Sequence, residues 1–277
     1  MRRLKQKTGI GISQILAMGF FTLVVLFAVI PGAFTTYDPL GLNLLNKLDG
    51  ISAEHLLGTD EYGRDILCRI IYGTRTSILV GFGTATVALA LGVPLGLIAG
   101  YYGGLADSII MRVMDAFQSF PSMLLAILMM TVFEPSVATL IITISLVSYP
   151  RFTRLVRSSV LSIKKLEYVE AARAAGANPL YIMFRCILPN CAGNIIAQFS
   201  LLMSTAILIE ASLSFLGFGI QPPEPTWGSM LSYGKRFVGS SLTYILGPTM
   251  IIFFVVMAIN TIGDMLKNML DPTKKGR

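Results

Sequence analysis

Residues 164–189 read KKLEYVEAARAAGANPLYIMFRCILP and form the longest strongly patterned polar segment in an otherwise apolar chain. Residues 163–175 favour a helix because they are rich in Ala, Leu, Glu and Lys, and Gly176 is suited to a left-handed C-cap. Asn178 is a good N-cap and Pro179 suits the first helical position, so a second helix is expected at once. The stretch therefore predicts a helix, a sharp turn and a second helix.

The first of these helices could pack against two kinds of surface, lipid or another protein. Its apolar residues recur every three to four positions, which leaves Glu167, Glu170 and Arg173 on other faces. A short amphipathic helix between membrane spans can lie on the lipid surface. The apolar face is weak here, however, because its small residues bury too little apolar area to hold well in lipid. Close packing in a groove of another protein suits them better, and they are Ala171, Ala172, Ala174, Ala175 and Gly176.

The composition is that of a polytopic membrane protein. Of the 277 residues, 54% are hydrophobic and 13% are charged, against about 25% charged in a soluble domain. The net charge of +7 comes from basic residues near the ends of apolar runs, so the positive-inside rule explains it and nucleic acid is not an expected partner. His55 stands alone in a polar loop and is expected to be an ordinary surface imidazole. The cysteines show neither a disulfide framework nor metal-ligand spacing, and they are Cys68, Cys186 and Cys191.

Residues 1–76 are predicted to form a first region with one span and one extracytoplasmic loop. Four basic residues within the first seven precede an apolar run at residues 15–30. No small-residue cleavage site follows, so the run is expected to be a retained span with a cytoplasmic N-terminus. In the loop, residues 55–77 are expected to form an interfacial amphipathic helix, with one side made by Ile66, Leu67, Ile70 and Ile71.

Residues 77–277 are predicted to hold five further spans. Each has about the 20 residues that a bilayer requires, and they are expected at residues 77–99, 108–133, 137–156, 192–215 and 242–262. The sequence thus predicts an all-α polytopic membrane protein with about six transmembrane helices and both termini in the cytoplasm. Residues 151–185 carry seven basic and two acidic side chains, which places the loop at residues 157–190 in the cytoplasm.

Several residues in these spans suggest specific contacts. Gly92, Gly96 and Gly100 recur every fourth residue, which predicts a close helix–helix seam inside the subunit. Arg112 and Asp115 share a helical face and are expected to neutralise each other. Other expectations are a Gly-rich turn at residues 101–107, a bend at Pro121 and an interfacial anchor at Trp227.

The loop from Glu170 resembles the cytoplasmic loop of the integral membrane subunits of bacterial ABC importers. The family pattern is Glu-Ala-Ala, three residues, Gly, nine residues, Ile, one residue and Leu-Pro. This chain has Cys186 in place of the Ile, and Ile187 beside it keeps the local apolar character. The matching positions are Glu170, Ala171, Ala172, Gly176, Leu188 and Pro189.

Further stretches look like the peptide and nickel branch of this family, and in particular like the shorter of its two paired permeases. Together they cover the chain from about residue 55 to residue 272. They are LLGTDEYGRD at 56–65, YYGG at 101–104, YPRFTRLVR at 149–157, EASLSFLGFGIQPPEPTWG at 210–228 and NTIGDMLKNMLDP at 260–272.

The resemblance implies a permease subunit in the bacterial cytoplasmic membrane. A coupling helix between spans four and five would insert into a groove on an ATPase subunit, with Glu170 and Arg173 making polar contacts. The implied partners are a homologous second permease in a heterodimer, two ATP-binding subunits, an extracytoplasmic substrate-binding protein and the lipid membrane. We expect four residues near the binding protein: Asp60, Arg64, Asp65 and Trp227.

The chain is not expected to be an enzyme. It has no GxxxxGK[ST] phosphate loop, no HExxH and no GxSxG motif, so ATP is expected to be hydrolysed, with Mg²⁺, on partner subunits, and this chain is expected to bind no cofactor. Peptide is the favoured substrate, and nickel or a metal chelate is the alternative. An ion-coupled secondary transporter needs ionisable residues at mid-membrane, where this chain is nearly uncharged. Transport that stops when the ATPase is disabled, but survives loss of the ion gradient, distinguishes the importer.

Overall fold

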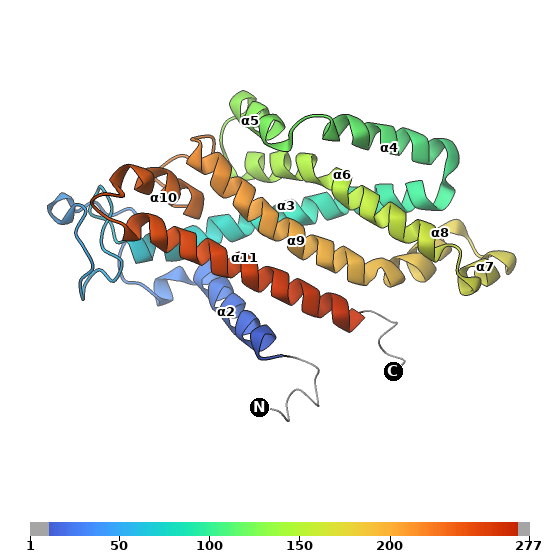
Figure 1. Cartoon of the computed structure of the whole chain (residues 1–277), viewed down its shortest axis with the longest axis horizontal. Coiled ribbons are helices and arrows are strands. Elements are labelled where there is room, and N and C mark those ends of the chain that lie inside the picture. Colours follow the sequence, from blue (N-terminus) through green and yellow to red (C-terminus); the bar gives the residue numbers. More distant parts are fainter. Residues whose placement is uncertain (1–10, 271–277) are drawn as a thin grey trace.

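The computed structural model describes residues 11–270, and the predicted cytoplasmic ends, residues 1–10 and 271–277, lie outside this range. Within it the chain is helical and contains no strand (Figure 1). The main helices are α2 (Ile12–Val29), α3 (Ile66–Tyr102), α4 (Gly104–Gln118), α5 (Ser122–Val132), α6 (Val137–Ile163), α7 (Glu167–Ala174), α8 (Pro179–Tyr181), α9 (Leu188–Phe215), α10 (Trp227–Gly234) and α11 (Thr243–Leu270). Shorter 3-10 turns are η1 (Pro31–Ala33), η2 (Leu44–Asn46) and η4 (Lys235–Phe237), and η3 (Ile182–Ile187) is π-helical.

Four helical segments are long and apolar enough to cross a membrane: α2, α3, Pro179–Phe215 and α11. Helices α4 and α5 are bent by 79° at the short break between them, and they make a fifth span if the bent pair is counted as one. Pro121, the N-cap of α5, lies at this break, as the sequence predicts. The sixth candidate is α6, whose 27 residues include three arginines in the second half. The count of six spans therefore stays a prediction.

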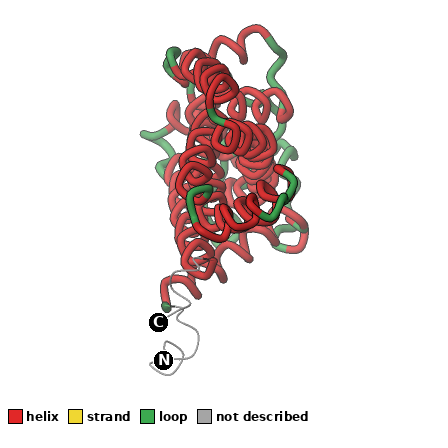
Figure 2. Tube along the Cα trace, turned by 90° about the vertical axis from the view of Figure 1, so that its right-hand side faces the viewer, coloured by secondary structure: helices red, strands yellow, loops and turns green. Residues whose placement is uncertain are grey.

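The glycine seam predicted in α3 is confirmed, and its partner is α6. A Cβ atom on Gly96 would lie 2.6 Å from the Thr153 carbonyl oxygen and 2.7 Å from Val156 Cβ. Similar clashes would occur at Gly92 and Gly100. The long helices pack nearly side by side along the molecule (Figure 1), and Figure 2 shows them end on as one bundle. Because the three glycines carry no side chain, the α3 and α6 backbones approach closely.

The amphipathic helix predicted at residues 55–77 is wrong in its first half. Residues 55–65 form a loop with left-handed turns at Gly58 and Gly63, where φ is +77° and +75°. Helix α3 starts only at Ile66, because the Asp65 carboxylate caps it by accepting a 2.6 Å hydrogen bond from the Cys68 amide. From there α3 is continuous to Tyr102, so the predicted region boundary at 76/77 falls inside a helix.

Other predicted boundaries also change. Helix α6 continues through Pro150 as far as Ile163, so the next helix, α7, starts at Glu167 rather than at residue 163. The turn expected at residues 101–107 consists of one residue, Gly103, which separates α3 from α4. The predicted pairing of Arg112 with Asp115 is wrong, because Asp115 instead pairs with Arg154 across the α4–α6 contact.

Candidate functional site

Helix α7 ends in a left-handed cap. Gly176 has φ +82°, and its amide donates to the Arg173 carbonyl at 3.0 Å, while the Ala177 amide donates to the Ala172 carbonyl at 3.1 Å. This pair of bonds is the Schellman motif, which satisfies carbonyls that a helix end leaves free. The predicted role of Gly176 as a C-cap is confirmed.

A second helix, α8, begins directly after the cap. The Asn178 side chain accepts from the Leu180 amide at 2.9 Å, and Pro179 holds the first helical position, as predicted. Helix α8 passes through the π-helical segment η3 directly into α9, where Leu188 and Pro189 form the first turn. Segments of π-helix are rare and often lie at functional sites, and no sequence pattern predicted this one.

Three contacts attach α7 to the transmembrane bundle. Val169 is completely buried among residues of the main core. The Tyr168 hydroxyl donates to the Cys186 carbonyl at 3.3 Å and accepts from the Asn190 amide at 3.0 Å, and burial raises the pKa of Tyr168. The Arg173 guanidinium lies 5.7 Å from the centre of the Tyr101 ring at the end of α3. The sequence prediction missed Tyr168 and Asn190 because their contact depends on the path of η3.

The rest of α7 is exposed at one end of the molecule, opposite α10 (Figure 1). The structure brings five predicted residues together on this surface: Glu170, Ala171, Ala172, Arg173 and Gly176. All are exposed except Ala172, which is half-buried. Exposed apolar side chains border them, with exposed fractions of 47 to 59%, and these are Leu166, Leu180, Tyr181 and Phe184. This end of the molecule is therefore a mixed surface of small, charged and apolar groups.

At the opposite end, the charged residues predicted to face a partner are buried. Asp60 is fully buried and accepts from Arg64 Nε at 2.6 Å, and Arg64 is 7% exposed. Asp65 lies 2.9 Å from His55 Nδ1, and both are nearly buried. The expectation of a surface imidazole at His55 is thus wrong. These groups hold the loop at residues 55–65 in shape and do not present their side chains outward.

Trp227 is also completely buried, so its predicted role as an interfacial anchor is wrong. Thr226 and Ser229 form a capping box that starts α10, and Trp227 is the first residue of this helix. Its Nε1 donates to the Ile70 carbonyl of α3 at 3.2 Å. Between this segment and the 55–65 loop lies a hollow of about 180 Å³, whose lining includes Glu61, Arg64, Arg69, Glu224 and Ser229. No group of three or more His, Cys, Asp or Glu side chains within residues 11–270 could hold a metal ion.

Glu210 is a buried acid near the C-terminal end of α9. It is 0% exposed, and its Oε1 accepts from the Ser214 hydroxyl at 2.9 Å and from the Thr226 hydroxyl at 3.0 Å. The second bond joins α9 to the N-cap of α10. Glu210 therefore fixes the segment that carries Trp227 to the bundle.

Comparison with known proteins identifies the family. The model of the family described as "Binding-protein-dependent transport system inner membrane component" matches residues 92–276. The chain belongs to this family. A dipeptide transport system permease protein, DppC, of Alkalihalophilus pseudofirmus is 44% identical over 98% of this chain and 88% of its own length. The glutathione transport system permease protein GsiD of Pectobacterium atrosepticum is 43% identical over 82% of this chain and 75% of its own.

A solved structure has a similar fold. A chain of the MetNI methionine ABC transporter in an inward-facing conformation matches with a TM-score of 0.63 and 18% identity, covering 74% of this chain and 97% of that chain. At this identity the likeness shows the fold alone. As an inner membrane component of a binding-protein-dependent transport system, the chain is a multi-pass permease rather than an enzyme, and ATP hydrolysis belongs to ATPase partners. A substrate-binding partner follows from the same assignment.

Proposed function

We propose that this chain is one of two homologous permeases in an ATP-driven importer of small peptides. The support for the substrate class is the agreement among relatives named for transport of dipeptides, di- and tripeptides and glutathione. Two ATP-binding subunits would hold Mg-ATP, and this chain would bind no cofactor. The two chain termini and α7 would lie on the cytoplasmic side, and α10 would lie on the outer side.

The observation that carries the coupling role is that α7 is both fixed and exposed. Val169 is buried in the main core, Tyr168 bonds to η3 and α9, and Arg173 lies against the end of α3, while Ala171, Ala174 and Gly176 remain exposed. A helix that transmits motion must be stiff, because a flexible loop absorbs the displacement. Small side chains allow close approach to a groove in a partner, so α7 is suited to be the coupling helix.

The outer loops are the proposed docking surface for the substrate-binding protein. Asp60, Arg64 and Asp65 act from inside, by fixing the loop that they occupy. The groups offered to the partner are exposed neighbours such as Tyr62 and Glu224. Buried ion pairs suit this positioning role, since removal of one partner leaves an uncompensated charge.

Substitution of Gly176 tests the coupling role. Proline fixes φ near −65°, whereas Gly176 has φ +82° and donates a hydrogen bond through its amide. Gly176→Pro, alone or with Glu170→Lys, should abolish association with the ATPase or peptide-stimulated ATP hydrolysis, while the permease still inserts into the membrane. Gly176→Asn is the matched control, because Asn tolerates the left-handed conformation and open space surrounds the glycine.

The measurements are copurification of the ATPase subunits, ATP hydrolysis and peptide uptake by the complete complex in proteoliposomes. The proline variant should lose coupled hydrolysis and uptake, and the asparagine variant should keep most of both. Normal hydrolysis and uptake by the Gly176→Pro, Glu170→Lys double variant would rule out α7 as the coupling element.

A further inference from the structure

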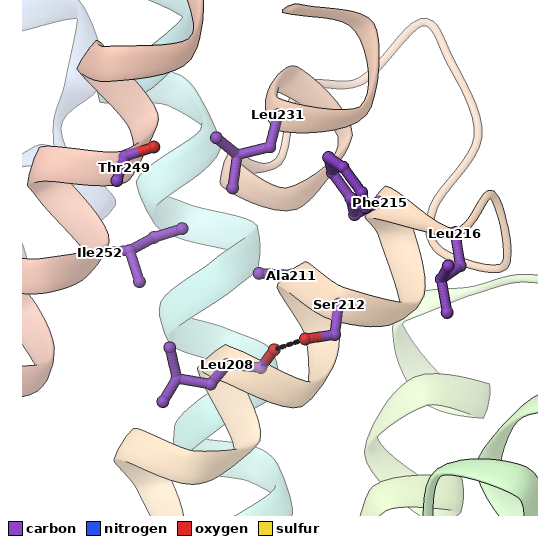
Figure 3. Close-up of a pocket in the computed structure, with 8 residues that line it drawn as sticks. All are labelled: Leu208, Ala211, Ser212, Phe215, Leu216, Leu231, Thr249 and Ile252. Atoms are coloured by element: carbon purple, nitrogen blue, oxygen red, sulfur yellow. Dashed lines mark hydrogen bonds between the residues drawn. The ribbon is translucent and has the colours of Figure 1, made fainter. Parts of the chain in front are cut away.

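Two hollows lie along the same side of α9, where it runs beside α11. The outer hollow has a volume of about 450 Å³ and is mostly apolar, with Leu208, Phe215 and Ile252 in its wall (Figure 3). The inner hollow has a volume of about 320 Å³ and a mixed lining, whose polar side chains include Asn194, Gln198, Asn260, Asp264 and Lys267. We call this surface the α9–α11 groove.

One continuous stripe of α9 runs along the groove. Its members are spaced alternately by four and three residues, which places them on one helical face. They extend over 18 residues, or about 27 Å at the helical rise, which is close to the thickness of a hydrocarbon core. Each is exposed or half-buried, and they are Asn194, Gln198, Leu201, Thr205, Leu208 and Ser212.

The inner part of the stripe is unsuited to lipid. The Gln198 amide has no hydrogen-bond partner among residues 11–270, and the Asn194 amide has only a 3.5 Å contact with Ser159. An amide placed in hydrocarbon without a hydrogen-bond partner is strongly disfavoured. The exposed side chains of α2 differ, because that helix offers large apolar groups such as Leu16 and Val29. The Gln198 amide therefore requires water or a polar ligand.

The floor of the groove is closed by packing between α9 and α11. The Ser204 hydroxyl donates to Asn260 Oδ1 at 3.1 Å. A Cβ atom on Gly263 would lie 2.4 Å from the Ser200 side chain, so the two helices touch at this level. The stripe consequently stays at the surface and cannot be covered by these two helices closing on each other.

We propose that the α9–α11 groove is the contribution of this chain to the substrate path, and that Gln198 and Asn194 hydrogen-bond the backbone amides of a small peptide. This proposal rests on the proposed function. A peptide backbone offers both donors and acceptors, which a side-chain amide can satisfy in either orientation. The apolar outer hollow is suited to the side chains of the peptide, which vary while the backbone stays constant.

Cysteine accessibility in the complete complex tests this assignment. Cys68 and Cys191 are buried, so Cys186→Ala leaves a background with little reactive thiol. Gln198→Cys, Thr205→Cys and Ser212→Cys then report on the stripe, and Thr22→Cys on α2 is the matched control with an exposed hydroxyl outside the groove. The probe is a small, charged, membrane-impermeant methanethiosulfonate, applied with and without a dipeptide and its binding protein.

The stripe positions should react, and the dipeptide should slow their labelling several-fold, while labelling at Thr22→Cys should be unaffected by dipeptide. Stripe positions that resist the reagent, or that react equally fast with and without dipeptide, would overturn the proposal. In addition, Gln198→Leu should raise the KM for peptide uptake several-fold, and Gln198→Asn should restore part of the loss. An unchanged KM in Gln198→Leu would also overturn it.

Uptake by the unmodified complex separates this proposal from the proposed function. A complex that hydrolyses ATP but never takes up di- or tripeptides contradicts the proposed substrate class. Normal peptide uptake combined with an unreactive stripe contradicts only the path assignment. The two failures are therefore distinguishable in one set of proteoliposomes.

Discussion

Gly96→Ala places one methyl group into the contact between α3 and α6. The added Cβ atom would lie 2.6 Å from the Thr153 carbonyl oxygen and 2.7 Å from Val156 Cβ. Carbon atoms at optimal contact are about 3.5–4.0 Å apart, so the helices must separate locally by about 1 Å. The nearest atoms belong to backbone and to a β-branched residue, and neither can swing away as the end of a long side chain could.

Two opposing effects set the size of the change. Overpacking a well-packed contact costs about 1–3 kcal/mol, whereas replacing glycine by alanine inside a helix gains up to about 1 kcal/mol. The net expectation for Gly96→Ala is a loss of about 0–3 kcal/mol, and Gly96→Val should lose more because it adds two further methyl groups at the same place. Gly19→Ala is the matched control: Gly19 also lies inside a helix, but nothing stands within 4 Å of an added Cβ. It should gain up to about 1 kcal/mol.

Thermal unfolding of the purified complex in nanodiscs measures these differences. The expected order of stability is Gly19→Ala at or above the unmodified protein, then Gly96→Ala, then Gly96→Val. ATP hydrolysis coupled to peptide uptake should fall in the same order, because α6 leads directly into the segment that carries α7. A Gly96→Val protein as stable as the Gly19→Ala protein would refute the account of the seam.

Two further substitutions test the outer end of the molecule. Glu210→Ala leaves the Ser214 and Thr226 hydroxyls without their acceptor and should lower the stability by about 1–3 kcal/mol. Glu210→Gln keeps the Oε1 acceptor and should lower it less. Equal melting temperatures for the two variants would contradict this expectation. Gly63→Ala should disrupt the 55–65 loop, because φ is +75° and the new Cβ would lie 1.7 Å from the Asn43 carbonyl oxygen. We expect the stability to fall by about 3 kcal/mol or more. Gly50→Ala, with open space around it, should change stability by less than about 0.5 kcal/mol, and limited proteolysis of the loop compares the two.

Features that depend on local sequence were predictable. The cap at Gly176, the N-cap at Asn178 and the bend at Pro121 each follow from the conformational limits of one or two residues. The α3–α6 seam was predictable as a close contact because small residues repeated with the helical period, although the sequence did not identify α6 as the partner. The small residues of the α7 surface were identified in the same way.

Features that depend on long-range packing were not predictable. Nothing near Trp227 in the sequence indicates that Ile70, 157 positions away, accepts its indole hydrogen bond. The buried positions of Asp60 and Asp65 likewise follow from partners that the folded loop supplies, since an acid in a polar segment is normally exposed. Arg112 and Asp115 satisfied the spacing rule for a helical pair, but Arg154 on a neighbouring helix paired with the acid.

Helix α9 connects the proposed coupling surface to the proposed path. Its 28 residues extend about 42 Å at the helical rise, with the η3 segment and the Tyr168 contact at one end and the Glu210 contact with Thr226 near the other. The stripe lies between them on the same helix. If the ATPase displaces α7, the displacement reaches α9 through the hydrogen bond between Tyr168 and Asn190, and a stiff α9 must carry the stripe with it. The π-helical segment η3 carries the Cys186 carbonyl that Tyr168 contacts, so the departure from α-helical hydrogen bonding between α8 and the stripe coincides with the point where α7 is attached.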